Sequence, residues 1–273
     1  MRRHNFRFDP QRLRMTVLDM AYAGSTVHLG CAFSIIEILA VLYRWHLRYP
    51  ANNPNAVDRD YLVLSKGHGV MAQYACMHEL GWLDDAAIKG YFSDGSALTG
   101  LSDSRVPGLE VTSGSLGHGF SVGVGLALAS KRYNSGQKTY VVVGDGEINE
   151  GAIWEGALFA AHNSLKDFMV IVDENGFQAM GRTSDVMSLN SISRKFDAFG
   201  FETVTVDGHD QEALNQAIQS LQSSALETPK AVIARTIKGK GVSFMENDNS
   251  WHYTRLTKDT YRQALDCLER KSG

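Results

Sequence analysis

Tyr140-Val-Val-Val-Gly-Asp-Gly-Glu-Ile-Asn-Glu-Gly151 and Met169-Val-Ile-Val-Asp-Glu-Asn-Gly176 share one pattern, an apolar run that turns polar and ends at a glycine. An unbroken, mostly β-branched run is typical of a strand covered on both faces, as in a parallel sheet. Parallel sheets bind ligands beyond the carboxyl ends of their strands. We therefore expect Asp145 and Asn175, which follow the two runs, to lie side by side at a ligand-binding edge.

The residue types at this edge suit a hard divalent cation. Mg²⁺ takes oxygen ligands and usually shares them with substrate phosphates. The carboxylate of Asp145, the amide oxygen of Asn175 and a backbone carbonyl would form half of such a site, and a diphosphate the other half. Gly-Asp-Gly alone is a common turn, and an aspartate after a strand is often a helix N-cap. The prediction therefore depends on the pairing with Asn175.

The rest of the chain alternates between helical and extended patterns. Strands are expected at 61–65, 139–144, 168–173, 202–206 and 230–236. Helices are expected at 10–24, from a capping box at Ser34–Glu37 through Tyr43, and at 70–81, 116–132, 150–165, 188–199, 210–223 and 257–268, with an irregular loop over 93–112. This alternation predicts an α/β fold with one mostly parallel central sheet and helices on both faces. No repeat or linker interrupts it, so residues 1–273 are expected to form one domain.

Composition excludes several classes of protein. A net charge of −3 over 273 residues gives no reason to expect nucleic acid or an anionic membrane as partner. Cys31, Cys76 and Cys267 are too widely spaced for a disulfide framework or a zinc site, and they fit a reducing cytosol. The basic start lacks the apolar run of a signal peptide, and no later run approaches the roughly 20 apolar residues of a membrane span. We expect a soluble, cytoplasmic protein.

Four segments carry a resemblance to a known family. They are Leu64-Ser-Lys-Gly-His-Gly69, Thr112-Ser-Gly-Ser-Leu-Gly-His-Gly119, Gly144-Asp-Gly-Glu-Ile-Asn-Glu-Gly-Ala-Ile-Trp-Glu155 and Lys238-Gly-Lys-Gly-Val-Ser-Phe-Met-Glu-Asn247. With the paired Asp145 and Asn175, the chain resembles the amino-terminal subunit of a split transketolase over nearly its whole length. The resemblance implies the thiamine-diphosphate-binding fold, and it implies that cofactor with Mg²⁺, or Ca²⁺ or Mn²⁺. It also implies a transferase that moves a two-carbon ketol unit from a ketose donor, phosphorylated or modified, to an aldehyde acceptor.

The same resemblance assigns roles to individual residues. The metal would be held by Asp145, Asn175 and the carbonyl of Phe177. The cofactor would contact His68, Gly114, Ser115, Leu116, His118, Gly144, Asp145, Gly146, Glu147, Asn175 and His252. His28, His68 and His252 would be catalytic, because imidazoles can polarise the donor carbonyl and handle protons near neutral pH. Glu150 would be catalytic at a subunit interface, where paired carboxylates can share a proton.

Each assignment has a simpler alternative. A histidine is often a surface or satisfied core residue, and Glu150 could be a glutamate favoured by the helix dipole. The glycines of 114–119 lack the order of a dinucleotide loop, and no Gly-Lys-Ser/Thr occurs, which makes Rossmann and P-loop sites poor interpretations. Lys238-Gly-Lys-Gly241 could meet a phosphate or form an exposed basic turn.

The chain departs from the family at Leu101. Many transketolases carry a histidine six residues before the proline of the Pro-Gly-Val/Leu-Glu segment, where it meets the first hydroxyl of the donor, and Leu101 occupies that place before Pro107. Two alternatives stay open, of which the departure at Leu101 suggests the first. The chain could belong to a pyruvate-using thiamine-diphosphate carboligase or decarboxylase, or it could be a non-catalytic regulatory or binding subunit.

A partner subunit is expected as well. Enzymes of this family activate the cofactor with a glutamate from a pyrimidine-binding domain, and after the strand at 230–236 only about one loop and one helix remain. That is too little for a further α/β domain of at least about 100 residues. We expect this domain on a separate carboxy-terminal subunit, in an assembly of two copies of each (α2β2).

Overall fold

Five parallel strands form the centre of the structure, a computed structural model that describes residues 6–50 and 52–270. Their spatial order is β1 (Tyr61–Leu64), β2 (Thr139–Gly144), β3 (Phe168–Glu174), β7 (Lys230–Arg235) and β6 (Glu202–Asp207). Gly144 pairs with Asp173, so the polar turns after β2 and β3 emerge next to each other. The expected parallel sheet is confirmed, and so is the adjacency of the two strand ends.

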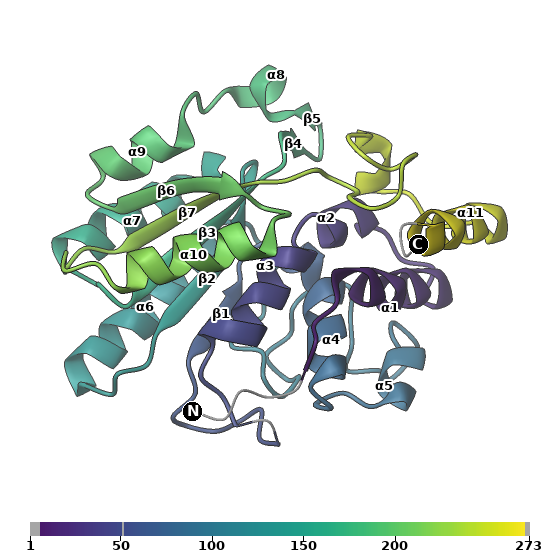
Figure 1. Ribbon diagram of the computed structural model, residues 1–273, viewed down its shortest axis with the longest axis horizontal. Helices are drawn as coiled ribbons and strands as arrows, with labels where there is room; N and C mark the ends of the chain where they lie inside the picture. The colour runs from purple at the N-terminus through teal and green to yellow at the C-terminus, as the bar shows by residue number, and fades with distance from the viewer. Residues whose placement is uncertain (1–5, 51, 271–273) are drawn as a thin grey trace.

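The apolar side chains of the strands contribute to two hydrophobic cores, one on each face of the sheet. Successive side chains of a strand point to opposite faces, and in β2 Tyr140 and Val142 join one cluster of buried residues while Val141 and Val143 join the other. Helices cover both faces (Figure 1). The first face carries α1 (Pro10–Ala23), α2 (Leu29–Phe33), α3 (Ile36–Val41), α4 (Val70–Glu79) and α10 (Gln211–Gln222), and the second carries α6 (His118–Tyr133), α7 (Gly151–His162) and α9 (Ile192–Ala198). The prediction of helices on both faces is therefore confirmed.

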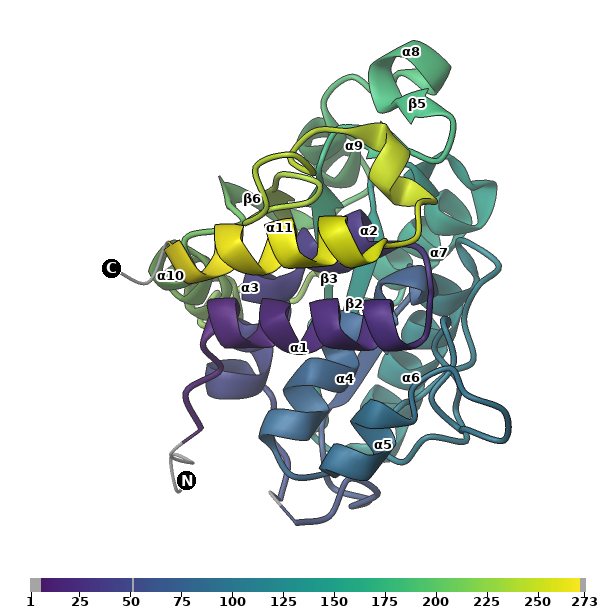
Figure 2. The ribbon, with the colours of Figure 1, turned by 90° about the vertical axis from the view of Figure 1, so that its right-hand side faces the viewer.

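The segment between β7 and the last helix, α11 (Lys258–Glu269), returns to the carboxyl edge of the sheet. Its backbone is tied to α2, because Gly239 N donates to Gly30 O at 3.1 Å and His28 N donates to His252 O at 3.2 Å. Figure 2 shows α11 lying alongside α1, where the Tyr261 hydroxyl donates to Asp19 at 2.7 Å. These contacts carry residues from the end of the chain back to the ligand-binding edge.

One expected helix start is wrong. Ser34 does not open a capping box, since α2 ends at Phe33 and α3 has Ile35 at its N-cap with no side-chain cap. The Ser34 hydroxyl instead lies within 2.8 Å of Asp173, and Glu37 binds Arg14 at 2.7 Å. Tertiary partners have displaced the local capping interaction in both residues.

The short elements were not predicted. They are α5 (Asp85–Lys89), α8 (Thr183–Met187) and the hairpin of β4 (Phe177–Gln178) with β5 (Gly181–Arg182). Elements of two to five residues leave too little periodicity in a sequence. Two predicted helices were longer than the observed ones, because α9 begins at Ile192 and α7 ends at His162.

Across residues 6–50 and 52–270, none of the helices is both long and apolar enough to cross a membrane. The basic start of the chain, residues 1–5, lies outside the described residues.

Candidate active site

A cleft of about 420 Å³ opens where β1, β2 and β3 end. Most of the predicted site residues line it, together with Leu101; they are His28, His68, Gly114, Leu116, Gly144, Asp145, Gly146, Glu147, Glu150, Asn175, Phe177 and His252. Ser115 and His118 are exposed and do not line the cleft. The fold thus brings segments from across the chain to a single edge of the sheet.

Asp145 and Asn175 are both buried at this edge. One carboxylate oxygen of Asp145 accepts from Gly176 N at 2.7 Å and from the Thr183 hydroxyl at 3.1 Å, and the other accepts from Gly146 N at 2.8 Å. Burial, and then the nearby charge of Asp173, raise the pKa of Asp145 to about 7. A carboxylate whose charge is this unfavourable gains from a bound cation.

Asp173 fixes the orientation of Asn175. The Asn175 amide nitrogen donates to Asp173 at 2.9 Å, which turns the amide oxygen the other way, where it accepts from Phe177 N at 3.0 Å. Carboxylate, amide and carbonyl oxygens are the ligands that Mg²⁺ and Ca²⁺ prefer. Asp145, Asn175 and the Phe177 carbonyl therefore fit a hard divalent cation.

A buried ion pair that sequence reasoning missed supports this arrangement. Lys66 and Asp173 are fully enclosed and their charged atoms lie 2.5 Å apart. Burial alone would raise the pKa of Asp173, but Lys66 outweighs it and lowers that pKa. Asp173 also accepts from the hydroxyls of Ser34 and Thr236. The available signal was a charged residue that directly follows the apolar run and is still part of strand β3, because a buried charge needs a partner.

Glu147 holds three loops together. Its carboxylate accepts from the Ser65 hydroxyl at 2.5 Å, from Gly117 N at 2.8 Å and from Gly144 N at 3.1 Å. Ser65 in turn accepts from Phe120 N at 2.9 Å. The loops that follow β1 and β2 and precede α6 are thereby fixed to one side chain, and Glu147 shapes the wall of the cleft whether or not it touches a ligand.

Three imidazoles form another part of the cleft wall. The ring centroids of His28, His68 and His252 lie 5.3 to 5.6 Å apart. Burial and the charges of nearby lysines lower the pKa of all three, that of His252 to about 3. The rings are therefore neutral near pH 7, where each can donate one hydrogen bond and accept another.

Lys238 is not part of an exposed turn. Its side chain is fully buried, and its ammonium donates to Asn249 at 2.7 Å and faces His252 Nδ1 at 2.9 Å. Burial lowers its pKa. The exposed-turn alternative for Lys238 is thus wrong. Lys66 lines the cleft and Lys238 contacts the lining residue His252, so both lysines place positive charge next to the cleft, as an anionic ligand would require.

The remaining wall residues leave polar groups unpaired. The Asn149 side-chain oxygen and the Gln178 side-chain nitrogen are buried and have no hydrogen-bond partner in the part of the chain that the structure describes. Glu150 is exposed at the N-cap of α7 without a side-chain capping bond. Buried polar groups without partners beside a cleft favour a ligand that forms the missing hydrogen bonds. The observed set of residues therefore fits a diphosphate and its cation.

The chain matches the family described as "Transketolase, thiamine diphosphate binding domain" over residues 10–269. It is 35% identical to one of the subunits of the apulose-4-phosphate transketolase of Phocaeicola vulgatus, covering 93% of this chain and 90% of that protein. It is 36% identical to a 6-deoxy-6-sulfo-D-fructose transketolase subunit of a Clostridium species, covering 90% of each.

Longer relatives are matched in part. Human transketolase is 31% identical, and the match covers 93% of this chain and 40% of that protein. The crystal structure of transketolase from Campylobacter jejuni superposes with a TM-score of 0.87 at 28% identity, over 95% of this chain and 42% of that one. The chain thus spans about two fifths of these longer enzymes and nearly all of the subunits named above.

Proposed function

This chain belongs to the transketolase family as its amino-terminal, thiamine-diphosphate-binding part, and from that premise we propose that it acts with a second subunit to transfer a two-carbon ketol unit from a ketose to an aldehyde. The observation that carries the proposal is the cleft itself. Asp145 and Asn175 present oxygen ligands in the same cleft as three neutral imidazoles. A metal-bound diphosphate and a ketose carbonyl need these two kinds of group within one site.

The cofactor sites follow from the chemistry of the cleft walls. Asp145, Asn175 and the Phe177 carbonyl would hold the divalent cation, with Mg²⁺ preferred and Ca²⁺ or Mn²⁺ acceptable. Gly114, Leu116, Gly144, Gly146 and Glu147 form the wall against which the diphosphate would lie, and Ser115 and His118 remain predicted contacts at its margin. When bound, thiamine diphosphate supplies the nucleophilic carbon and the electron sink for ketol transfer.

The protein's own part is orientation and proton handling. His28, His68 and His252 are neutral at physiological pH, so each can hydrogen-bond to the carbonyl or a hydroxyl of the donor without adding a buried charge. Glu150 is exposed beside the same cleft. We propose that it meets a carboxylate of the partner subunit there.

The partner would supply the pyrimidine-binding domain. The names of the relatives from Phocaeicola vulgatus and the Clostridium species describe subunits, and this chain covers about nine tenths of each. We propose a single diphosphate-binding domain in this chain, an α2β2 assembly and a cytoplasmic enzyme. Those two relatives are named for different ketoses, so a ketose is proposed here as the donor class; the pyruvate-using and non-catalytic alternatives are set aside.

Removal of either metal ligand tests the cofactor site. Asp145→Ala and Asn175→Ala should each weaken Mg²⁺-dependent binding of thiamine diphosphate by more than about 100-fold, because even outer-shell partners of metal ligands are worth 10- to 100-fold. Titration calorimetry with the complete two-subunit enzyme measures the affinity. Asp185→Ala, which removes an exposed carboxylate on α8, is the control and should bind normally. Near-native affinity in both ligand variants would place the metal elsewhere.

A further inference from the structure

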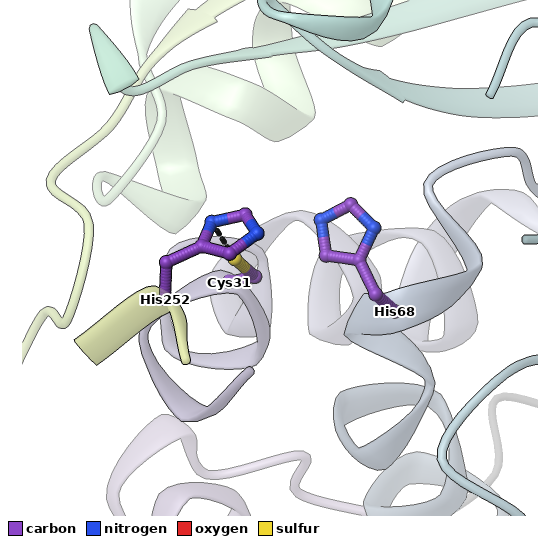
Figure 3. Close-up of side chains that lie close together, drawn as sticks. All are labelled: Cys31, His68 and His252. Carbon is purple, nitrogen blue, oxygen red and sulfur yellow. Dashed lines mark hydrogen bonds between the residues drawn. The ribbon is translucent and has the colours of Figure 1, made fainter. Parts of the chain in front are cut away.

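Cys31, His68 and His252 form a cluster of metal-ligand type within the cleft. Each residue offers a ligand atom, and these atoms all lie within 4.8 Å of one another. Figure 3 shows the two imidazoles with the Cys31 sulfur beside His252. The three residues come from α2, from the loop after β1 and from the segment before α11, so only the folded chain assembles them.

The spacing of this cluster approaches that of a tetrahedral zinc site. Zn–S and Zn–N bonds of about 2.3 and 2.0–2.1 Å at tetrahedral angles separate the two ligand atoms by about 3.5 Å. The Cys31 sulfur lies 3.4 Å from His252 Nδ1. The ligand atom of His68 lies within 4.8 Å of the other two, so it must move by up to about 1.4 Å to complete three protein ligands, and all three residues line the cleft, where a fourth ligand can enter.

The ligand atoms are chemically different from those of the Asp145 site. A thiolate and imidazoles prefer Zn²⁺ and similar transition metals, whereas carboxylate and carbonyl oxygens prefer Mg²⁺ and Ca²⁺. The imidazoles of His68 and His252 are neutral and line the cleft, which gives an ion a path to them. One cleft thus contains oxygen ligands that suit Mg²⁺ or Ca²⁺ and a separate set of sulfur and nitrogen ligands that suits Zn²⁺.

One positive charge opposes a metal here. The ammonium of Lys238 lies 2.9 Å from His252 Nδ1, the same atom that faces the Cys31 sulfur. Lys238 also donates to Asn249 at 2.7 Å, so it has a second partner that it can keep when it leaves the imidazole. Lys66 is already paired with Asp173. Lys238 is therefore the main competitor of an incoming cation.

We propose that Cys31, His68 and His252 bind a borderline-soft transition metal, Zn²⁺ above all, and that this metal excludes thiamine diphosphate from the cleft. Binding replaces the proton of the Cys31 thiol by the metal, and that proton is released to solvent. The exclusion rests on the proposed function, because two of the ligands, His68 and His252, are proposed contacts of the cofactor. The metal site itself does not depend on that function.

Cobalt titration of the full chain, without cofactor, tests the metal site. Co²⁺ substitutes for Zn²⁺ and gives a thiolate-to-metal charge-transfer band in the near ultraviolet. We expect the band to saturate at one equivalent and to disappear in Cys31→Ser. It should remain in the control Cys267→Ser, which removes the half-buried thiol of α11. A wild-type chain without the band, or a band that survives in Cys31→Ser, would overturn the site.

Two further variants guard against misfolding. His252→Asn lies in a partly exposed turn and should need at least tenfold more cobalt to produce the band, while Lys238→Met should need less cobalt than the wild type. A purely structural role for Cys31 predicts neither change, and unchanged affinity in both variants would refute the proposal.

Competition then tests exclusion. Thiamine diphosphate with Mg²⁺ should raise the cobalt concentration needed for half-saturation at least tenfold. Unchanged cobalt affinity in the complete two-subunit enzyme, once calorimetry shows it to be loaded with cofactor, would refute exclusion alone. Failure of the complete two-subunit enzyme to load cofactor at all would instead count against the proposed function.

Discussion

At the residue scale, we expect Leu101 to affect substrate choice without displacing the proposed metal ligands. It is 42% exposed, lines the cleft, and packs so closely over Gly114 that a Cβ on this glycine would lie 2.9 Å from Leu101 Cδ1. It offers a donor no hydrogen bond. The residue at this position can therefore change the preference for a donor hydroxyl while leaving Asp145 and Asn175 in place.

Leu101→His should favour donors that carry a hydroxyl on the first carbon. One net hydrogen bond is worth about 1–1.5 kcal/mol, so the ratio of kcat/KM between hydroxyl-bearing and deoxy donors should rise about tenfold. Steady-state kinetics of the two-subunit enzyme measure this ratio. Leu101→Met keeps the shape without the hydrogen bond and is the control; equal ratios in the two variants would disprove the assignment.

Single residues differed in how far the sequence could predict them. Asp145 and Asn175 were predictable because each directly follows an apolar strand, and adjacency of strand ends is a property of parallel sheets. Lys66, Lys238 and Cys31 were not assigned, because their importance comes from partners far away in the chain: Asp173 for Lys66, and His252 for the other two. Such pairings depend on the completed fold.

At the scale of elements, helix α6 depends on close contact with the loop after β1. A Cβ on Gly119 would lie 2.7 Å from the backbone Cα of Ser65, and Ser65 binds both Phe120 N and Glu147. The backbone of a well-packed loop cannot move aside without a substantial cost in free energy. Gly125, later in the same helix, is exposed, and a Cβ there would meet nothing within 4 Å.

Gly119→Ala should therefore destabilise the chain by about 1–3 kcal/mol, the usual cost of overpacking. Gly125→Ala should stabilise it by up to about 1 kcal/mol, because alanine is the better helix former. Urea unfolding of both variants measures the free energies. If the two substitutions changed stability by the same amount, the contact with Ser65 would not determine the position of α6.

A second junction of elements predicts acid sensitivity. Glu37 on α3 lies 2.7 Å from Arg14 on α1 and 2.9 Å from His209 in the turn after β6. Burial alone would raise the pKa of Glu37, but Arg14 and His209 outweigh it and lower that pKa to about 2. A depressed carboxyl pKa stabilises the fold above the unfolded-state value and loses that contribution as pH falls.

The pKa of Glu37 falls from the ordinary value of 4.5 to about 2 on folding. As the pH falls through this range, protonation of Glu37 should lower the free energy of unfolding by about 3 kcal/mol. The free energy of unfolding, measured by denaturant titration at each pH, should fall more steeply in the wild type than in Glu37→Gln. Glu227→Gln, which removes an exposed carboxylate, is the control and should follow the wild type. Parallel curves for the wild type and Glu37→Gln would show that the junction contributes no acid sensitivity.

Long elements were predicted better than short ones, and so were elements whose apolar periodicity and capping residues lie within the element itself. All five strands of the sheet and the helices α1, α4, α6, α7, α10 and α11 follow apolar periodicity, and Asp9 and Asp210 cap the helices α1 and α10. Around Ser34 the local pattern was misleading, because Asp173 offered that hydroxyl a stronger partner. The hairpin of β4 and β5, which carries Phe177, was too short to leave a pattern.

At the scale of the whole molecule, one surface is suited to a partner. Exposed apolar side chains occur on the packed helices α6 and α7, namely Val122, Leu158 and Phe159, which are 41%, 61% and 45% exposed. Glu150 caps α7 and lines the cleft, so this surface continues to the site. Apolar surface of this kind marks places where proteins associate.

The reconstituted reaction tests the central claim most directly. The purified chain, the product of the neighbouring reading frame, and the two combined should each be assayed for ketol transfer from a ketose to an aldehyde with thiamine diphosphate and Mg²⁺. The account predicts transfer by the combination and none by either component alone. Full transfer by this chain alone would contradict it.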